Sequence, residues 1–301
     1  MNRARPLVHA YAAHRQNILG QGVGIAIVDT GLSLHPDFGS RITGWCDTLY
    51  AGRKPYDDCG HGSHVAGIAA GNGTLSHGRY MGIAPQASLI GVKVLDNKGN
   101  GFISHIMRGL DWILRNKDNL NIRIVNISIG ANDFETYHEG SAFVRKVNTL
   151  WDAGIVVVAA AGNRGPERYT ISAPGNSRKI ITVGSSDFFH AMPNTGRRTK
   201  EAHSGTGPTL ACIKKPDVVA PGSRIVSCSA FSRPQETPYQ EKSGTSMSTP
   251  IVSGAIALLL CRYPDMTPLE VKIRLKNSST DLNMPHEKQG WGLLNIGALL
   301  S

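Results

Sequence analysis

Three side chains that could act together in nucleophilic catalysis are spread along the sequence. Asp29 ends a short apolar stretch at a glycine turn, His61 lies between two glycines, and Ser246 precedes a long apolar run. A serine hydroxyl is too weakly acidic to attack an acyl carbon without a base, and a carboxylate can orient that base. The chain order Asp, His, Ser matters, since unrelated serine hydrolase architectures differ in it.

The residues around Ser246 place it where a loop becomes a helix. The sequence GTSMSTP spans 244–250, and the apolar run 251–260 is about long enough for three turns of buried helix. Backbone N–H groups in the first turn of a helix lack partners within the helix, so they can stabilise negative charge beside the hydroxyl. This position suits a nucleophile.

Four motifs in this order resemble those of the subtilases, the subtilisin-like serine proteases. They are VDTG around Asp29, GHGSHVAGI around His61, AAAGN ending at Asn163 and GTSMSTP around Ser246. The resemblance covers residues 22–297, and Ser63 and Ser248 replace the usual Thr and Ala of the family. Each motif alone is weak, but four in register indicate this family, with an intracellular bacterial type as the expected subgroup.

The resemblance implies a role for each of these side chains. Ser246 is the expected nucleophile, His61 the general base and then acid, and Asp29 the group that orients His61. The side-chain amide of Asn163, together with the backbone N–H of Ser246, is expected to stabilise the tetrahedral oxyanion. The chemistry needs no cofactor.

The resemblance also implies where a peptide would bind. Ser128, Ile129 and Gly130 are expected to pair with an extended substrate, and Ala160, Ala161 and Gly162 to form the other wall of the P1 pocket. These apolar walls predict an apolar or aromatic P1 side chain. Arg164, on the expected rim, predicts that basic P1 residues are disfavoured and acidic ones partly tolerated. The expected partners are peptides or unfolded proteins.

Alternating apolar and amphipathic stretches predict a three-layer α/β fold. Continuous apolar runs, typical of strands buried on both faces, alternate with helical stretches, so we expect a mostly parallel sheet with helices on both faces, as in subtilisin. Expected strands cover 24–29, 88–94, 122–129, 155–160 and 180–184, and expected helices cover 103–116 and 142–153. Thr267 and Glu270 predict a capping box at a further helix start.

We expect one peptidase domain over 22–301, preceded by an amino-terminal extension over 1–21. The stretch 7–19 has helical composition. A helix packed on the body is the favoured interpretation, and the alternative is a short prosegment remnant that occupies the substrate cleft.

Composition narrows the class of protein. The formal charge of +10 is dispersed, with Arg197, Arg198 and Lys200 as its densest cluster, so a solvated basic surface is favoured over nucleic-acid binding. Five cysteines without CxxC spacing suggest a reducing compartment, and no export or membrane-spanning segment is evident, so a cytoplasmic protein is expected and a secreted mature form stays open. The oligomeric state is not determined by the sequence.

Several alternatives compete with this interpretation. A noncatalytic peptide-binding pseudoprotease is the first, and an α/β-hydrolase esterase is the second, although the sequence lacks G-x-S-x-G and the order of that triad. His61 and His64 could share a metal, but no third ligand stands at a recognisable spacing. Structural calcium is conceivable because Asp37 matches a ligand position of relatives, yet the loop 71–78 contains no carboxylate, so we assign no metal site.

Overall fold

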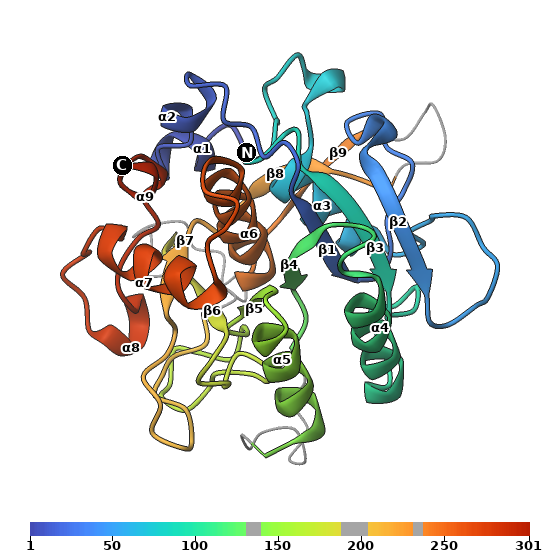
Figure 1. Cartoon of the computed structure of the whole chain (residues 1–301). Helices are drawn as coiled ribbons and strands as arrows, with labels where there is room; N and C mark the ends of the chain where they lie inside the picture. Colours follow the sequence, from blue (N-terminus) through green and yellow to red (C-terminus); the bar gives the residue numbers. More distant parts are fainter. Residues whose placement is uncertain (131–139, 188–203, 231–236) are drawn as a thin grey trace, which may run out of the picture.

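A parallel sheet forms the centre of the computed structural model, which describes residues 1–130, 140–187, 204–230 and 237–301. Within these residues the sheet has the strand order β2-β3-β1-β4-β5-β6-β7, and every neighbouring pair is parallel (Figure 1). The strands are β1 Gly24–Asp29, β2 Ile42–Asp47, β3 Ser88–Lys93, β4 Ile122–Ile127, β5 Val156–Ala160, β6 Ile181–Ser185 and β7 Val218–Ala220. The expected strands are confirmed within a few residues, and β2 and β7 are additions.

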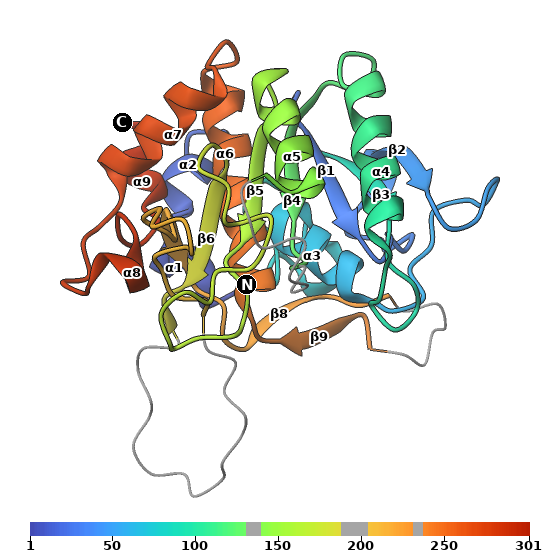
Figure 2. The same ribbon diagram turned by 90° about the horizontal axis from the view of Figure 1, so that it is seen from below.

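Helices cover both faces of this sheet. The longer ones are α3 His61–Ala70, α4 Ile103–Asn116, α5 Ala142–Asp152, α6 Thr245–Arg262 and α7 Pro268–Ser278. One apolar core contains side chains of α3 and α6, and a second core on the other face contains side chains of α4 and α5 (Figures 1 and 2). The predicted three-layer, subtilisin-like α/β arrangement is confirmed.

Strand β1 shows why the strands of this sheet appear in the sequence as continuous apolar runs. Ile25 and Ile27 join the core beneath α3 and α6, whereas Ala26 and Val28 join the core beneath α4 and α5. Successive side chains of a strand point to opposite faces, so a strand covered on both sides needs apolar residues at every position. The strand ends at Asp29, which is fully buried.

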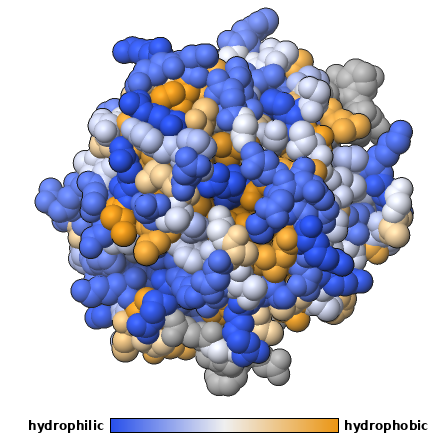
Figure 3. Space-filling model, viewed as in Figure 1, coloured by the Kyte–Doolittle hydropathy of each residue, from blue (hydrophilic) through white to orange (hydrophobic). Residues whose placement is uncertain are grey.

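Helix α6 runs through the middle of the larger core. It is the one described helix that is long and apolar enough to cross a membrane, and 83% of its apolar window is buried inside the protein. Its composition therefore reflects core packing. On the face shown in Figure 3, apolar side chains occur in separate patches among hydrophilic ones. From the sequence we expected about three helical turns over 251–260, and α6 extends beyond both ends of that range.

A two-stranded antiparallel hairpin lies outside the main sheet. Its strands are β8 Ile225–Cys228 and β9 Tyr239–Lys242, and β9 leads directly into the loop before α6. Figure 2 shows it along the lower edge of the molecule. The sequence analysis did not identify it, because β9 contains Gln240, Glu241 and Lys242 and so lacks an apolar pattern.

The amino-terminal segment is packed on the body, but it is not one helix. The prediction of a helix over 7–19 is wrong: α1 Ala4–Leu7 and α2 Tyr11–His14 are separated by His9, whose φ of 56° is left-handed. The Val8 carbonyl accepts a hydrogen bond from Ile296 N, so a tertiary contact takes an acceptor that a continuous helix would use. Both helices lie beside α9 Ile296–Leu300 (Figure 1).

Two further expectations concern local structure. Helix α7 begins with the predicted capping box, in which Thr267 accepts from Glu270 N and Glu270 accepts from Thr267 N, so that prediction is confirmed. The basic cluster at 197–200 lies outside the described residues. The expected loop 71–78 contains a short 3-10 turn, Thr74–Ser76.

Candidate active site

The candidate catalytic groups gather at the carboxyl ends of three adjacent strands. In the sheet β1 lies beside β4, and β4 lies beside β5. Neighbouring strands are about 4.8 Å apart, so Asp29 after β1, Ser128 after β4 and the segment after β5 occupy one edge. This edge is where open α/β sheets bind ligands.

Asp29 and His61 form a hydrogen-bonded pair at this edge. Asp29 Oδ1 lies 2.7 Å from His61 Nδ1 and also accepts from Thr30 N at 2.7 Å. The imidazole is 26% exposed, while the carboxylate is buried. Burial disfavours the imidazolium, but the charge and hydrogen bond of Asp29 outweigh it and raise the pKa of His61 above its ordinary value. With a proton on Nδ1, the other ring nitrogen is a free acceptor.

The start of α3 is held in place by Asp57, which the sequence analysis did not single out. Its Oδ1 accepts from Thr30 Oγ1 at 2.9 Å and from Gly60 N at 2.8 Å, and its Oδ2 accepts from Ser63 N at 2.8 Å and Ser63 Oγ at 2.7 Å. A carboxylate at this point satisfies N–H groups that lack partners within the helix. Asp57 thereby connects the residue after Asp29 to the helix that carries His61.

A glycine lets the two elements approach. A Cβ atom on Gly62 would lie 2.2 Å from the Gly31 carbonyl oxygen and 3.2 Å from Asp29 Cβ, which no side chain could tolerate. Gly62 N donates to Thr30 Oγ1 at 2.9 Å. The glycine after His61 therefore permits the 2.7 Å contact between His61 and Asp29.

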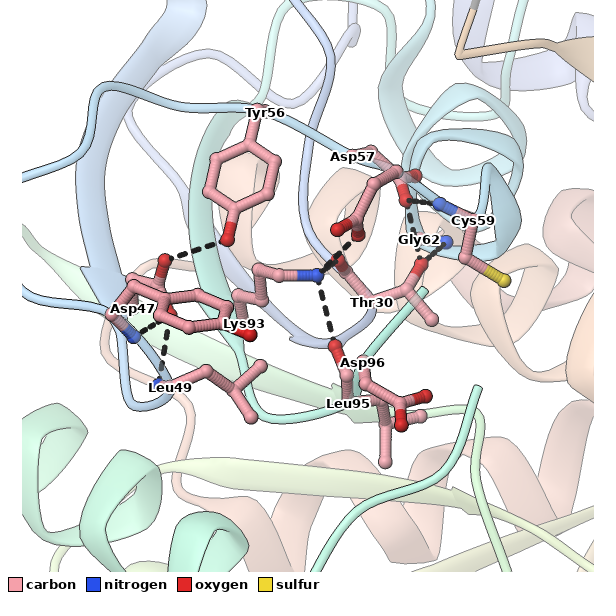
Figure 4. Close-up of polar contacts among 12 residues, drawn as sticks. Thr30, Asp47, Leu49, Tyr56, Asp57, Cys59, Gly62, Lys93, Leu95 and Asp96 are labelled. Atoms are coloured by element: carbon pink, nitrogen blue, oxygen red, sulfur yellow. Dashed lines mark hydrogen bonds and ion pairs between the residues drawn. The ribbon is translucent and has the colours of Figure 1, made fainter. Parts of the chain in front are cut away.

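A buried lysine supports the same turn from the next strand. Lys93 on β3 lies opposite Asp29 in the register with β1. Its Nζ donates to Thr30 O, to Leu95 O at 2.9 Å and to Asp58 Oδ1 at 2.7 Å (Figure 4). Its side chain is fully buried, so these three acceptors compensate the loss of water around the ammonium. Figure 4 shows this lysine and Asp57 on either side of Thr30.

Ser246 is the second residue of α6 and is bonded to the end of β4. Its Oγ donates to the Ser128 carbonyl oxygen at 2.8 Å, and Ser128 Oγ donates to the Ser246 carbonyl oxygen at 3.0 Å. Within the part of the chain that the structure describes, no hydrogen bond joins Ser246 to His61. The Ser246 hydroxyl has to leave the Ser128 carbonyl oxygen before His61, at the start of α3, can accept its proton.

Asn163 follows β5 and is oriented by α6. Its Oδ1 accepts from Thr245 N at 2.9 Å and from Thr245 Oγ1 at 3.1 Å. An amide whose oxygen is held in this way presents its NH₂ group away from that contact. The residue is exposed, so the NH₂ group is free to meet a ligand beside Ser246.

The two expected substrate-binding segments lie on neighbouring strand ends. Ser128, Ile129 and Gly130 follow β4. Ala160 is the last residue of β5, Ala161 and Gly162 follow it, and Ala160 and Ala161 are buried. Gly162 has a φ of 93°, and a Cβ there would lie 2.2 Å from Ser172 Oγ, while one on Gly130 would lie 3.0 Å from Ser172 Cβ. Ser172 thus fills the space between the two segments, a role that no sequence signal indicated. Arg164 is exposed at the end of the second segment.

His64 does not share the site of His61. Its Nε2 contacts the carbonyl oxygens of Gln240 at 3.0 Å and Ile225 at 3.1 Å, which ties α3 to the β8-β9 hairpin. Burial lowers the pKa of His64 to about 3, so the ring stays neutral near pH 7. His64 therefore packs away from His61, and its Nε2 is taken up by these two carbonyl oxygens instead of a metal shared with His61.

A buried polar cluster elsewhere contains residue types that can bind metals. His35, Asp37 and Cys228 bring such atoms within 4.8 Å of one another. His35 Nδ1 accepts from Asp37 N at 3.0 Å, and the Asp37 carboxylate accepts from Tyr239 Oη at 2.7 Å and Leu75 N at 3.1 Å. Protein donors already occupy these atoms, so we assign no metal here, and structural calcium stays unassigned.

Comparison with known proteins gives the same picture over the whole chain. The sequence model of the Subtilase family, peptidase S8, matches residues 20–292. Serine protease AprX of Bacillus subtilis is 43% identical over 277 residues, which cover 88% of this chain and 62% of AprX. Subtilisin BL of Lederbergia lenta is 35% identical over 292 residues, covering 97% of this chain and 95% of that protein.

The fold of this chain is also similar to that of a solved structure. The crystal structure of a cold adapted subtilisin-like serine proteinase superposes with a TM-score of 0.73 at 28% sequence identity. The match covers 93% of this chain and 90% of that one. The chain therefore spans nearly the whole of some relatives and less than two thirds of AprX.

Proposed function

Because this chain belongs to the subtilase family, whose enzymes hydrolyse peptide bonds, we propose that it is a serine endopeptidase with Asp29, His61 and Ser246 as its catalytic triad. The observation that carries the proposal is the 2.7 Å contact between Asp29 and His61, at a strand end adjacent to the one that binds Ser246. No cofactor enters the proposed chemistry.

The proposed reaction starts with the neutral imidazole. His61 removes the proton from Ser246 Oγ as that oxygen forms a bond to the substrate carbonyl carbon, and Asp29 stabilises the resulting imidazolium. The tetrahedral intermediate collapses when the C–N bond breaks and the leaving amine takes the proton from His61. Water then repeats the sequence on the acyl-enzyme, which releases the acid and restores the Ser246 hydroxyl.

We assign the oxyanion site to Asn163 and to the backbone N–H of Ser246. Thr245 holds the amide oxygen of Asn163, which leaves its NH₂ group as a donor. Donors fixed before the reaction begins stabilise charge without reorganising, which makes such sites effective.

Peptide binding accounts for how the hydroxyl would reach His61. An extended substrate along Ser128–Gly130 would offer a backbone N–H to the Ser128 carbonyl oxygen. That oxygen now accepts from Ser246 Oγ, so a bound peptide competes for it and releases the hydroxyl toward His61.

The apolar segment Ala160–Gly162 favours an apolar or aromatic P1 residue, and the charge of Arg164 disfavours a basic one. Fastest cleavage after Lys, in a comparison of P1 Phe, Glu and Lys peptides, would contradict this assignment.

The noncatalytic alternative has one observation in its favour, the hydrogen bond of Ser246 to Ser128 instead of His61. Reaction with a fluorophosphonate probe separates the two proposals. We expect the wild type to gain one covalent adduct on Ser246 and to cleave a peptide library, and Ser246→Ala to do neither, with kcat lower by about 10⁶, the loss known for subtilisin. A folded wild type that gains no adduct would support the peptide-binding alternative.

Peptides or unfolded proteins are the proposed substrates. The five cysteines are free thiols. A cytoplasmic location stays a prediction, as does the absence of nucleic-acid and membrane partners.

A further inference from the structure

Pro250 leaves the carbonyl group of Ser246 without a partner in its own helix. In an α-helix this carbonyl would accept from the N–H of the residue four positions later, and proline has none. Ser128 Oγ supplies the missing donor at 3.0 Å. The interruption in α6 therefore creates the acceptor through which β4 holds the nucleophile.

Two buried side chains determine the direction of that donor. Asn126 Nδ2 donates to Ser128 Oγ at 2.9 Å. Ser253 Oγ has two acceptors for its one proton, Asn126 Oδ1 at 2.8 Å and Thr249 O at 3.2 Å, and the shorter contact is the one to Asn126. Asn126 and Ser253 are fully buried, and Ser128 is 2% exposed. Because Ser128 Oγ accepts from Asn126, its own proton is directed to Ser246 O.

These hydrogen bonds form a series in which Ser253 donates to Asn126, Asn126 to Ser128, and Ser128 to Ser246 O. Ser253 orients the series because it fixes the Asn126 amide oxygen. Without the Ser253 hydroxyl, no other hydrogen bond among the described residues holds the Asn126 amide oxygen, and the amide can turn that oxygen toward Ser128. Ser128 Oγ would then donate to Asn126, and Ser246 O would lose its donor. The hydrogen bond that ties Ser246 to the end of β4 would then be lost, so the first turn of α6 would shift.

We propose that Asn126 and Ser253 are positioning residues for the Ser246 nucleophile, acting through Ser128 on the carbonyl that Pro250 leaves free. This inference rests on the proposed serine endopeptidase function. Neither residue touches the reacting atoms. Their effect is to fix the Ser246 backbone, and with it the hydroxyl and the N–H of the oxyanion site, relative to the end of β4.

Ser253→Ala tests the proposal, with Ser248→Ala as the matched control. Ser248 is buried in the same helix, and its hydroxyl donates to Ala220 O at 2.9 Å, outside this series of hydrogen bonds. We expect Ser253→Ala to slow fluorophosphonate acylation and to lower kcat by roughly 10-fold with KM changed less than about 2-fold, since small misplacements of reacting groups cost 10–10²-fold. Ser248→Ala should keep the wild-type acylation rate at a similar loss of Tm.

A double-variant cycle separates positioning from a general loss of packing. Asn126→Ala should lower kcat at least as much as Ser253→Ala, and adding Ser253→Ala to it should change kcat little further, because Ser253 acts through Asn126. If Asn126→Ala does not fold, Ser128→Ala replaces it in the cycle. Multiplicative losses, or equal acylation rates for Ser253→Ala and Ser248→Ala, would overturn the inference. A wild type that is folded but unreactive would instead refute the proposed function.

Discussion

Asn163 is a single residue whose amide oxygen is held by Thr245 and whose NH₂ group is free. We predict that Asn163→Ala lowers kcat by about 10²–10³ with little change in KM, the loss known for the corresponding donor of subtilisin. Steady-state kinetics on one peptide checks this, with Asn116→Ala, at the end of α4, as a control that keeps wild-type kcat. A loss that appears mainly in KM would indicate that Asn163 binds substrate and transition state equally.

Lys242 is a residue whose charge opposes protonation of His61. Burial lowers the pKa of His61, Asp29 raises it, and the positive charge of Lys242 lowers it. In the proposed mechanism His61 acts as a base only when neutral, so activity should be lost as the pH falls through its pKa. We predict that Lys242→Gln raises this pKa and moves the acid limb of kcat/KM to higher pH.

The measurement is a pH profile of kcat/KM at low ionic strength, because salt screens exposed charges. Lys276→Gln, on an exposed part of α7, should leave the acid limb in place. An acid limb that moves to lower pH in Lys242→Gln would show that another group controls it.

At the scale of elements, Asp57 joins the turn after β1 to the first turn of α3. Replacing it by Asn exchanges one acceptor oxygen for a donor that faces either the Ser63 or the Gly60 group. We predict that Asp57→Asn lowers the free energy of unfolding by about 1–3 kcal/mol, the cost of unsatisfied buried polar groups. Denaturant unfolding measures it, with exposed Asp118→Asn as control.

Asp57→Asn should also change the protonation of His61, which is a second, independent prediction. The negative charge of Asp57 raises the pKa of His61, so Asp57→Asn should move the acid limb of kcat/KM to lower pH, opposite to Lys242→Gln. A variant that is destabilised but keeps the wild-type acid limb would show that Asp57 only caps the helix.

At the scale of the whole molecule, the amino-terminal segment is part of the fold. Met1 N donates to Val226 O at 2.8 Å, Arg5 donates to Gly78 O at 2.8 Å, and the Val8 side chain is fully buried. We predict that deleting residues 1–19 lowers the free energy of unfolding by at least about 3 kcal/mol, because the burial of the Met1 and Val8 side chains against the body is lost.

The deletion also tests the alternative origin of this segment. A docked segment predicts an unchanged kcat/KM for the folded fraction of the shortened protein, whereas a remnant in the substrate cleft predicts a higher kcat/KM. We would measure kcat/KM of both proteins at a temperature below both unfolding transitions and count the active sites by fluorophosphonate labelling.

Contacts between distant segments explain why some of this could not be predicted. The helix expected over 7–19 has the right composition, but Ile296 N takes the Val8 carbonyl and the chain turns at His9. The role of Asp57 was not predicted, because its partners Thr30 and Ser63 lie in the turn after β1 and in α3 and come together only in the fold. Helix α4 and the start of α7 were predicted closely, since the periodicity of α4 and the capping box of α7 are local.

The sequence by itself determined the family, the alternation of strands and helices, and the candidates Asp29, His61, Asn163 and Ser246, because these depend on residue type and local order. Only the tertiary structure decided which strand ends are neighbours, and therefore that Ser246 donates to Ser128 and that Asn126 and Ser253 stand behind it. The hydrogen bonds from Ser246 to Ser128 and from Ser253 to Asn126 join residues 118 and 127 positions apart, and no local pattern encodes a partner at that separation.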